Sequence, residues 1–138
     1  MRTRRSQKEP PDRYGPLAVA HGAFNVVGGL WPLVHLRSFE WVFGSKRERW
    51  LQHTVGGLLV ANGVSQLAGA GSADRRASAR TTGLTTALTL LAVDLAYVPK
   101  GRIRPTYLLD AVMEAGWITA WLRARQREGA GRARAPGS

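Results

Sequence analysis

Residues 81–122, TTGLTTALTLLAVDLAYVPKGRIRPTYLLDAVMEAGWITAWL, contain two apolar runs joined by a short basic connector, PKGRIRP. Each run is long enough for a helix, and the short connector makes the two helices antiparallel neighbours. Three carboxylates lie inside these runs. Asp94 is in the first run, whereas Asp110 and Glu114 are in the second, four residues apart and therefore on one helical face. The environment of these three acids is the central question about the chain.

The charge of the chain lies outside its apolar segments. A net charge of +11 is typical of a nucleic-acid-binding protein, yet residues 17–36 and 54–73 contain no Asp, Glu, Lys or Arg. About 20 apolar residues cross the hydrocarbon core of a bilayer. The sequence therefore predicts an all-α, up-down-up-down bundle of four transmembrane helices with the lipid bilayer, and no specific nucleic acid, as its partner. The spans are expected at about 17–36, 54–73, 81–99 and 106–122, and a soluble helical bundle is the alternative.

The two ends of the chain are basic and rich in helix-breaking residues, so residues 1–16 and 123–138 are predicted to be disordered. These ends and the loop after the second span hold 13 Lys and Arg residues, against 7 in the other two connectors. This excess predicts a multi-pass protein of the cell membrane with both termini in the cytoplasm. A signal peptide fits less well, because the first apolar run is too long and no small-residue cleavage site follows it.

The first span carries a polar stripe. His21, Asn25 and His35 lie at offsets of 0, 4 and 14, within about 40° of one line along a helix of 3.6 residues per turn. This face is expected to point into protein, since lipid cannot satisfy it. Two histidines at this spacing also suggest haem, but haem needs axial ligands from a second helix, and the remaining histidine, His53, lies at a helix end. No cofactor is predicted.

The connector between the first two spans mixes aromatic and basic residues, which settle at the level of lipid headgroups. Ser38 is expected to be the N-cap of a short interfacial helix that stops at Gly44. The segment anchors the protein or, alternatively, binds a headgroup or a partner. Together with the second basic connector it supplies the predicted interfacial anchors, which are Trp41, Trp50, Arg37, Arg102 and Arg104.

The second span has small residues at every fourth position, a pattern that allows close approach of helices in lipid. These residues are Gly57, Ala61, Ser65 and Gly69. Asn62 and Gln66 lie beside them. Their amides are interpreted as hydrogen-bonding contacts between helices, and the alternative is that they line a polar pathway.

The fourth span repeats the stripe with other chemistry, since Asp110, Glu114, Trp117 and Trp121 lie at offsets of 0, 4, 7 and 11. A charged carboxylate at mid-bilayer costs about 2.5 to 3.5 kcal/mol, so these acids must be protonated, paired or hydrated. Asp110 is close enough to the span's start to reach a connector arginine, whereas Glu114 is expected near mid-membrane.

The depths assigned to the polar residues predict a shared cavity or proton path. Asn25, Asn62 and Glu114 are expected to meet at mid-membrane, so that Glu114 pairs with one of the amides. His35, Asp94 and Asp110 are expected nearer the outer surface, beside the connector arginines. The candidate residues are Glu114, Asp110, Asp94, Asn25, Asn62, His21 and His35.

Three segments carry a resemblance: HGAFNVVGGLWPLVHLRSFEWVFGSK, RWLQHTVGGLLVANG and VDLAYVPKGRIRPTYLLDAVMEAGW. Together they cover about residues 20–122, and they resemble a group of small four-span bacterial membrane proteins of uncharacterised function. The layout is also similar to that of DoxX-like proteins, although no specific motif is shared. The resemblance implies the four-helix membrane architecture and no activity.

Function is not decided by any motif, because the chain lacks HExxH, P-loop, GxGxxG and Ser-His-Asp patterns, and it has no cysteine. A metal site of Asp110 and Glu114 with His21 or His35 would need ligands that converge, and their depths differ. The leading interpretation is an accessory or structural membrane subunit, as a homo-oligomer or in a larger complex. The alternatives are a small proton- or cation-coupled transporter or channel, and a membrane enzyme acting on a lipid-like substrate.

Overall fold

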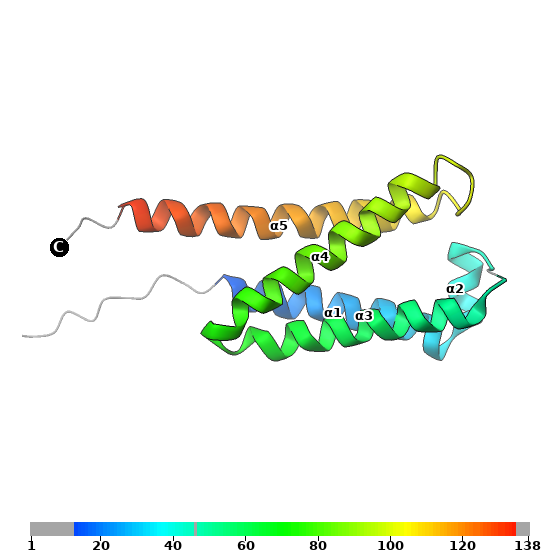
Figure 1. The fold of residues 1–138 in the computed structure, drawn as a ribbon, viewed down its shortest axis with the longest axis horizontal. Coiled ribbons are helices and arrows are strands. Elements are labelled where there is room, and N and C mark those ends of the chain that lie inside the picture. Colours follow the sequence, from blue (N-terminus) through cyan, green and yellow to red (C-terminus); the bar gives the residue numbers. More distant parts are fainter. Residues whose placement is uncertain (1–12, 46, 135–138) are drawn as a thin grey trace, which may run out of the picture.

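Helices joined by short connections make up the described part of the chain. The computed structural model describes residues 13–45 and 47–134, in which there is no strand. The helices are α1 (Tyr14–Val34), α2 (Leu36–Phe43), α3 (Arg49–Ala70), α4 (Ala73–Tyr97) and α5 (Tyr107–Arg134). Figure 1 shows α1 and α3 side by side and α4 running diagonally from the end of α3 to α5. The all-α prediction is confirmed.

The four long helices occupy the positions of the four predicted spans. Among the described residues, α1 alone is long and apolar enough to cross a membrane by length and composition. Helix α4 begins with the charged sequence ADRRASAR and α5 ends with RARQREGAGRAR, while α3 contains several Gly, Asn and Gln residues. These residues lower the mean hydropathy of α3, α4 and α5, so composition supports one candidate span.

The contact between α1 and α3 is made by two pairs of glycines. A Cβ atom added to Gly63 would lie 2.5 Å from the backbone oxygen of Gly22, and one added to Gly56 would lie 2.7 Å from that of Gly29. Real Cβ atoms essentially never approach another atom within 3.0 Å. Only glycine permits so close an approach of two backbones, and α1 and α3 therefore form the most closely packed helix pair in the fold.

The predicted line of small residues on α3 is wrong in register. Gly57 has no atom within 4 Å of an added Cβ, Ala61 and Ser65 are exposed, and only Gly69 of that line is buried. The reason is geometrical. A step of four residues drifts about 40° around a helix, whereas a step of seven, the separation of the two contact glycines in α3, drifts only about 20°.

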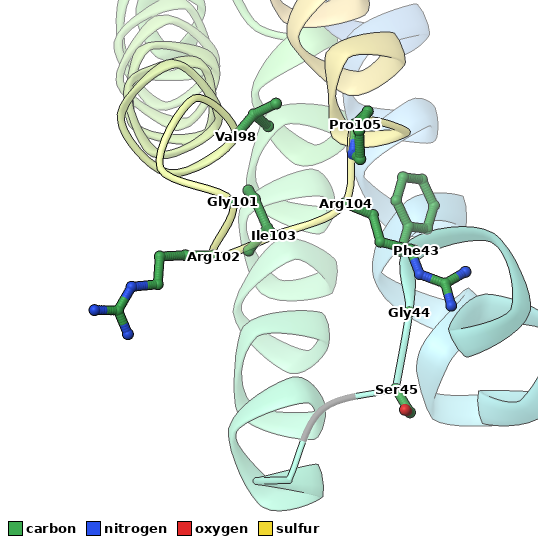
Figure 2. Close-up of a pocket in the computed structure, with 9 residues that line it drawn as sticks. All are labelled: Phe43, Gly44, Ser45, Val98, Gly101, Arg102, Ile103, Arg104 and Pro105. Atoms are coloured by element: carbon green, nitrogen blue, oxygen red, sulfur yellow. The ribbon is translucent and has the colours of Figure 1, made fainter.

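The short helix α2 is hydrogen-bonded to the connector between α4 and α5. Arg104 donates a hydrogen bond through Nη1 to the carbonyl oxygen of Trp41 (3.2 Å), and Thr106 donates through Oγ1 to that of Val42 (2.8 Å). Both acceptors belong to the last turn of α2, whose carbonyls have no partner within the helix. Figure 2 shows Arg104 lying against Gly44, just beyond this helix end, and Arg102 directed away from it.

The predicted cap of this helix is also corrected. His35 is the N-cap residue, and its Nδ1 accepts a hydrogen bond from the backbone N–H of Ser38 at 3.3 Å. The Ser38 hydroxyl lies 2.9 Å from the same nitrogen, so Ser38 supports the cap as the third residue of the helix. The stop at Gly44, which has φ of 88°, is confirmed.

The described ends of the chain lie on the same side of the fold (Figure 1). The hydroxyl of Tyr14, at the start of α1, donates to a carboxylate oxygen of Glu128 in α5 at 2.8 Å. Helix α5 includes residues 123–134, and α1 includes residues 14–16. The sequence predicts disorder for both stretches, and that prediction is wrong for these residues. Residues 1–12 and 135–138 of these two predicted segments lie outside the described residues.

Candidate functional site

The interior of the helix bundle is polar. Apart from Trp121, the buried hydrophobic side chains of the described residues are small alanines, whereas large aliphatic and aromatic side chains are exposed on all the long helices. The largest side chains that are completely buried are Trp121, His21, Gln66, Glu114 and Asn25. All five carry polar groups that need partners once they are removed from water, the indole N–H of Trp121 included. The candidate site is this polar interior.

His21 is held between two tryptophans of α5. The indole N–H of Trp121 donates to Nδ1 of His21 at 3.0 Å. The Trp117 ring stacks on the imidazole with 4.6 Å between centroids and 10° between planes. Because Nδ1 accepts this hydrogen bond, the neutral imidazole carries its proton on Nε2. The histidine thus links α1 to α5.

Asn25 lies one turn further along α1 and is bound to α3. Its Nδ2 donates to Oε1 of Gln66 at 2.7 Å, and both residues are buried. A Cβ atom added to Gly83 of α4 would contact Nε2 of Gln66 and would lie 3.0 Å from both Nδ1 of His21 and Nε1 of Trp121. Gly83 therefore provides the space in which side chains from α1, α3 and α5 converge. We call His21, Asn25, Gln66 and Trp121 the paired cluster.

Asn62 and Asp94 lie elsewhere in the interior. Asn62 of α3 donates through Nδ2 to the hydroxyl oxygen of Thr86 in α4 at 3.1 Å, and it is half-buried. This hydrogen bond agrees with the interpretation of Asn62 as a contact between helices. Asp94 is 2% exposed and shares the buried face of α4 with Gly83 and Ala87.

Glu114 differs from the buried residues of the paired cluster and, like Gln52, has a side chain without a hydrogen-bond partner among the described residues. Its side chain is completely buried, and neither carboxyl oxygen has a hydrogen-bond partner among the described residues. The predicted pairing with Asn25 or Asn62 is wrong, because Asn25 is bound to Gln66 and Asn62 to Thr86. The charged groups that act on Glu114 are Asp110 and Asp94, both of the same sign. Within the described part of the chain, Glu114 therefore has neither a hydrogen bond nor an attractive charge.

Glu114 lines a cavity of about 600 Å³. Asp110 lies one turn away on the same wall, and Asn25 and Gln52 contribute amides from α1 and α3. The remainder of the lining is mainly aliphatic and aromatic and comes from every helix of the fold. The candidate polar-cavity residues that meet here are therefore Asn25, Asp110 and Glu114.

Other predicted site residues do not join the cavity. His35 is exposed and its ring is used by the cap of α2, so the expected cluster of His35, Asp110 and connector arginines does not form. Arg104 is bound to α2, and Arg102 lines a second hollow of about 570 Å³ beside the α4–α5 connector (Figure 2). The predicted anchors Arg37, Trp41 and Trp50 are exposed.

The sequence interpretation of Gln66 as a contact between helices agrees with its hydrogen bond to Asn25, whereas Gln52 was not singled out. Both are buried, together with Gly56 and Gly63 of the same helix. These four residues lie at offsets of 0, 14, 4 and 11, which is the spacing of the stripes on α1 and α5. The same periodicity search applied to the second span would have found this face.

No protein-family model matches the chain, and neither a curated protein nor a solved structure is similar to it. The resemblance to small four-span bacterial membrane proteins stays a prediction. Among the described residues there is no group of three or more His, Cys, Asp or Glu that could hold a metal ion. The function must therefore be argued from the polar interior and its cavity.

Proposed function

We propose that the chain is a multi-pass membrane protein that crosses the bilayer with α1, α3, α4 and α5. The support is the distribution of side chains, with polar groups inside and large apolar groups outside. Val27, Leu58, Leu95 and Val112, one from each long helix, are between 57% and 71% exposed. In water such a surface would be unfavourable over its whole extent, whereas in lipid it is the expected exterior.

The orientation we propose has both termini in the cytoplasm. The excess of basic residues at the two ends supports it, as does the Tyr14–Glu128 hydrogen bond, which keeps the start of α1 beside the end of α5. Reporter fusions at residue 138 and within the α4–α5 connector test this orientation. A C-terminal reporter active only on the outer face would overturn it.

Within this membrane protein, we propose that Glu114 takes up and releases a proton or a cation, so that the protein acts as a small cation-coupled carrier. The observation that carries the proposal is a completely buried carboxyl group on the wall of a cavity, with no hydrogen-bond partner among the described residues. A purely structural acid would be paired, because an unpaired buried polar group costs about 1 to 3 kcal/mol. An intramembrane acid of this kind is most simply explained by function.

The test is proton flux in proteoliposomes that contain a pH-sensitive dye, driven by a potassium diffusion potential. We expect the native protein to conduct protons above the background of empty liposomes. Glu114→Gln keeps the size of the side chain but cannot titrate, and we expect its flux to fall to background. Asp74→Asn is the matched control, since Asp74 is an exposed acid in the first turn of α4. Equal flux from the native protein and the Glu114→Gln variant would overturn the proposal.

An accessory membrane subunit is the second candidate. The paired cluster favours it, because its hydrogen bonds join α1 to α3 and to α5 without serving any ligand. An absence of flux from correctly folded native protein would select this candidate.

A further inference from the structure

The lining of the cavity defines the ligand that it can accept. The described residues that line the cavity include three acids, Glu48, Asp110 and Glu114. They include no Lys, Arg or His. An anion would find no complementary charge here, whereas a cation would meet two carboxyl groups of α5 that lie one helical turn apart.

The burial of Glu114 distinguishes this group of acids from a cluster of carboxylates on the surface. Its side chain is completely buried and lines the cavity, and neither of its oxygens has a hydrogen-bond partner among the described residues. A carboxyl group in this state still has its full capacity to accept hydrogen bonds or to face a positive charge. Glu114 and the half-buried Asp110 therefore mark the polar end of the site.

The other walls exclude a simple inorganic ion as the best-matched ligand. Calcium takes six to eight oxygen ligands and magnesium a near-ideal octahedron, and no metal-holding group of three or more His, Cys, Asp or Glu is found in the described residues. The walls instead present five aromatic rings, those of Phe24, Trp31, Phe39, Phe43 and Tyr107. Aromatic faces attract organic ammonium groups.

The volume of the cavity also fits a small organic ligand. About 600 Å³ lies in the range of about 300 to 1,000 Å³ that small-molecule sites occupy. Such sites combine mainly apolar walls with a few polar groups that fix orientation. This cavity has that composition.

The cavity opens on the apolar exterior. Val27, Leu109 and Met113 line it and are also 67%, 66% and 48% exposed, respectively. If the exterior of the bundle is covered by lipid, the opening faces the acyl chains. A ligand that has already partitioned into the bilayer would enter from the side without crossing an aqueous mouth.

We propose that this cavity binds an amphipathic organic cation, an apolar or aromatic body with one positive centre, which enters from the bilayer and places its charge beside Glu114 and Asp110. The inference rests on the proposed function for its membrane setting and names the ligand class of the same site. It differs from proton uptake alone, because the ligand must fill the aromatic part of the cavity.

The test compares two probes of the same shape and opposite charge on the detergent-solubilised full chain. Equilibrium dialysis measures binding of tetraphenylphosphonium and of tetraphenylborate. We expect saturable binding of the phosphonium and none of the borate. Glu114→Gln should weaken phosphonium binding by about tenfold or more, because a contact with a charged group is lost, whereas Asp74→Asn should bind like the native protein. Melting curves establish that each variant is folded.

The outcomes separate the ligand class from the proposed function. Equal binding of the two probes, or equal phosphonium binding by folded native and Glu114→Gln proteins, overturns the ligand class. Glu114-dependent proton flux without phosphonium binding overturns the ligand class and leaves the carrier proposal standing. Saturable, charge-selective binding without flux upholds the ligand class and overturns the carrier proposal. Should Glu114→Gln fail to fold, the comparison of the two probes on native protein and on Asp110→Asn decides whether the ligand class holds.

Discussion

The paired cluster and the cavity wall at Glu114 lie in the same bundle interior and share α1 and α5, yet they differ in whether a buried side chain is bound to another helix. In the paired cluster, His21 and Asn25 each have a hydrogen bond to another helix. At the cavity, the equally buried Glu114 has no such bond among the described residues. Single atoms of the paired cluster, namely Nε2 of His21, Oδ1 of Asn25 and Nε2 of Gln66, also lack a partner among the described residues. Because a buried hydrogen bond joins helices and an unpaired buried carboxyl does not, the first region stabilises the fold, and the second is the one that we propose as a ligand site.

The largest expected contrast is between two substitutions by leucine. Gln66→Leu leaves Nδ2 of Asn25 without its acceptor, and the free energy of unfolding should fall by about 1 to 3 kcal/mol. Glu114→Leu removes a buried carboxyl that has no hydrogen-bond partner in the described part of the chain, so stability should be unchanged or higher, while binding of tetraphenylphosphonium is lost. Thermal melting in detergent compares the variants. A large loss of stability in Glu114→Leu would mean that this acid is structural.

Filling the space at Gly83 should disturb only the paired cluster. The added methyl group of Gly83→Ala would contact Gln66, His21 and Trp121, and overpacking of this kind costs about 1 to 3 kcal/mol, offset by about 1 kcal/mol of helix propensity. Gly116→Ala in α5 is the control, since no atom lies within 4 Å of its added Cβ. We expect a lower melting temperature for Gly83→Ala and an equal or higher one for Gly116→Ala. The reverse order would contradict the convergence of the cluster on Gly83.

The two tryptophans that hold His21 should differ in their sensitivity. Trp121→Phe loses the hydrogen bond to Nδ1 of His21, which should lower the free energy of unfolding by about 1 kcal/mol. Trp117→Phe keeps a ring for stacking and loses an indole N–H that has no partner among the described residues, so its stability should change little. Chemical unfolding followed by circular dichroism measures both. Equal losses would show that ring size, rather than the hydrogen bond, matters at Trp121.

The smallest effect is expected where the polar contact is only partly buried. Asn62→Ala removes the hydrogen bond to Thr86, and the expected loss of stability is about 0.5 kcal/mol, at the low end for a hydrogen bond. Binding of the phosphonium probe should be unchanged, because Asn62 is not among the described residues that line the cavity. Weaker binding in this variant would extend the site beyond the cavity wall.

Several features of the fold could be predicted because they repeat with the helical period. The apolar runs predict the long helices, and the stripes at His21 and Glu114 predict the faces that turn inward, since side chains at offsets of 4, 7 and 11 share one face in any α-helix. The stop of α2 at Gly44 follows from the freedom of glycine at positive φ. These inferences are local and need no knowledge of neighbouring helices.

Pairings between helices could not be predicted in the same way. The sequence places Asn25, Asn62 and Glu114 at similar depths, but depth does not fix the rotation or the crossing of each helix. Close packing at the Gly22–Gly63 and Gly29–Gly56 contacts sets the approach of α1 to α3, and this brings Asn25 to Gln66 rather than to Glu114.

Periodicity along the chain thus accounts for which side chains face inward, because it depends only on backbone geometry. Which of them are paired was decided in the tertiary structure, because a hydrogen bond forms only when two atoms on different helices come within about 3 Å. That distance depends on the packing of all the helices together. The carboxyl of Glu114 remains unpaired because this packing brings no donor from the described residues within reach of it.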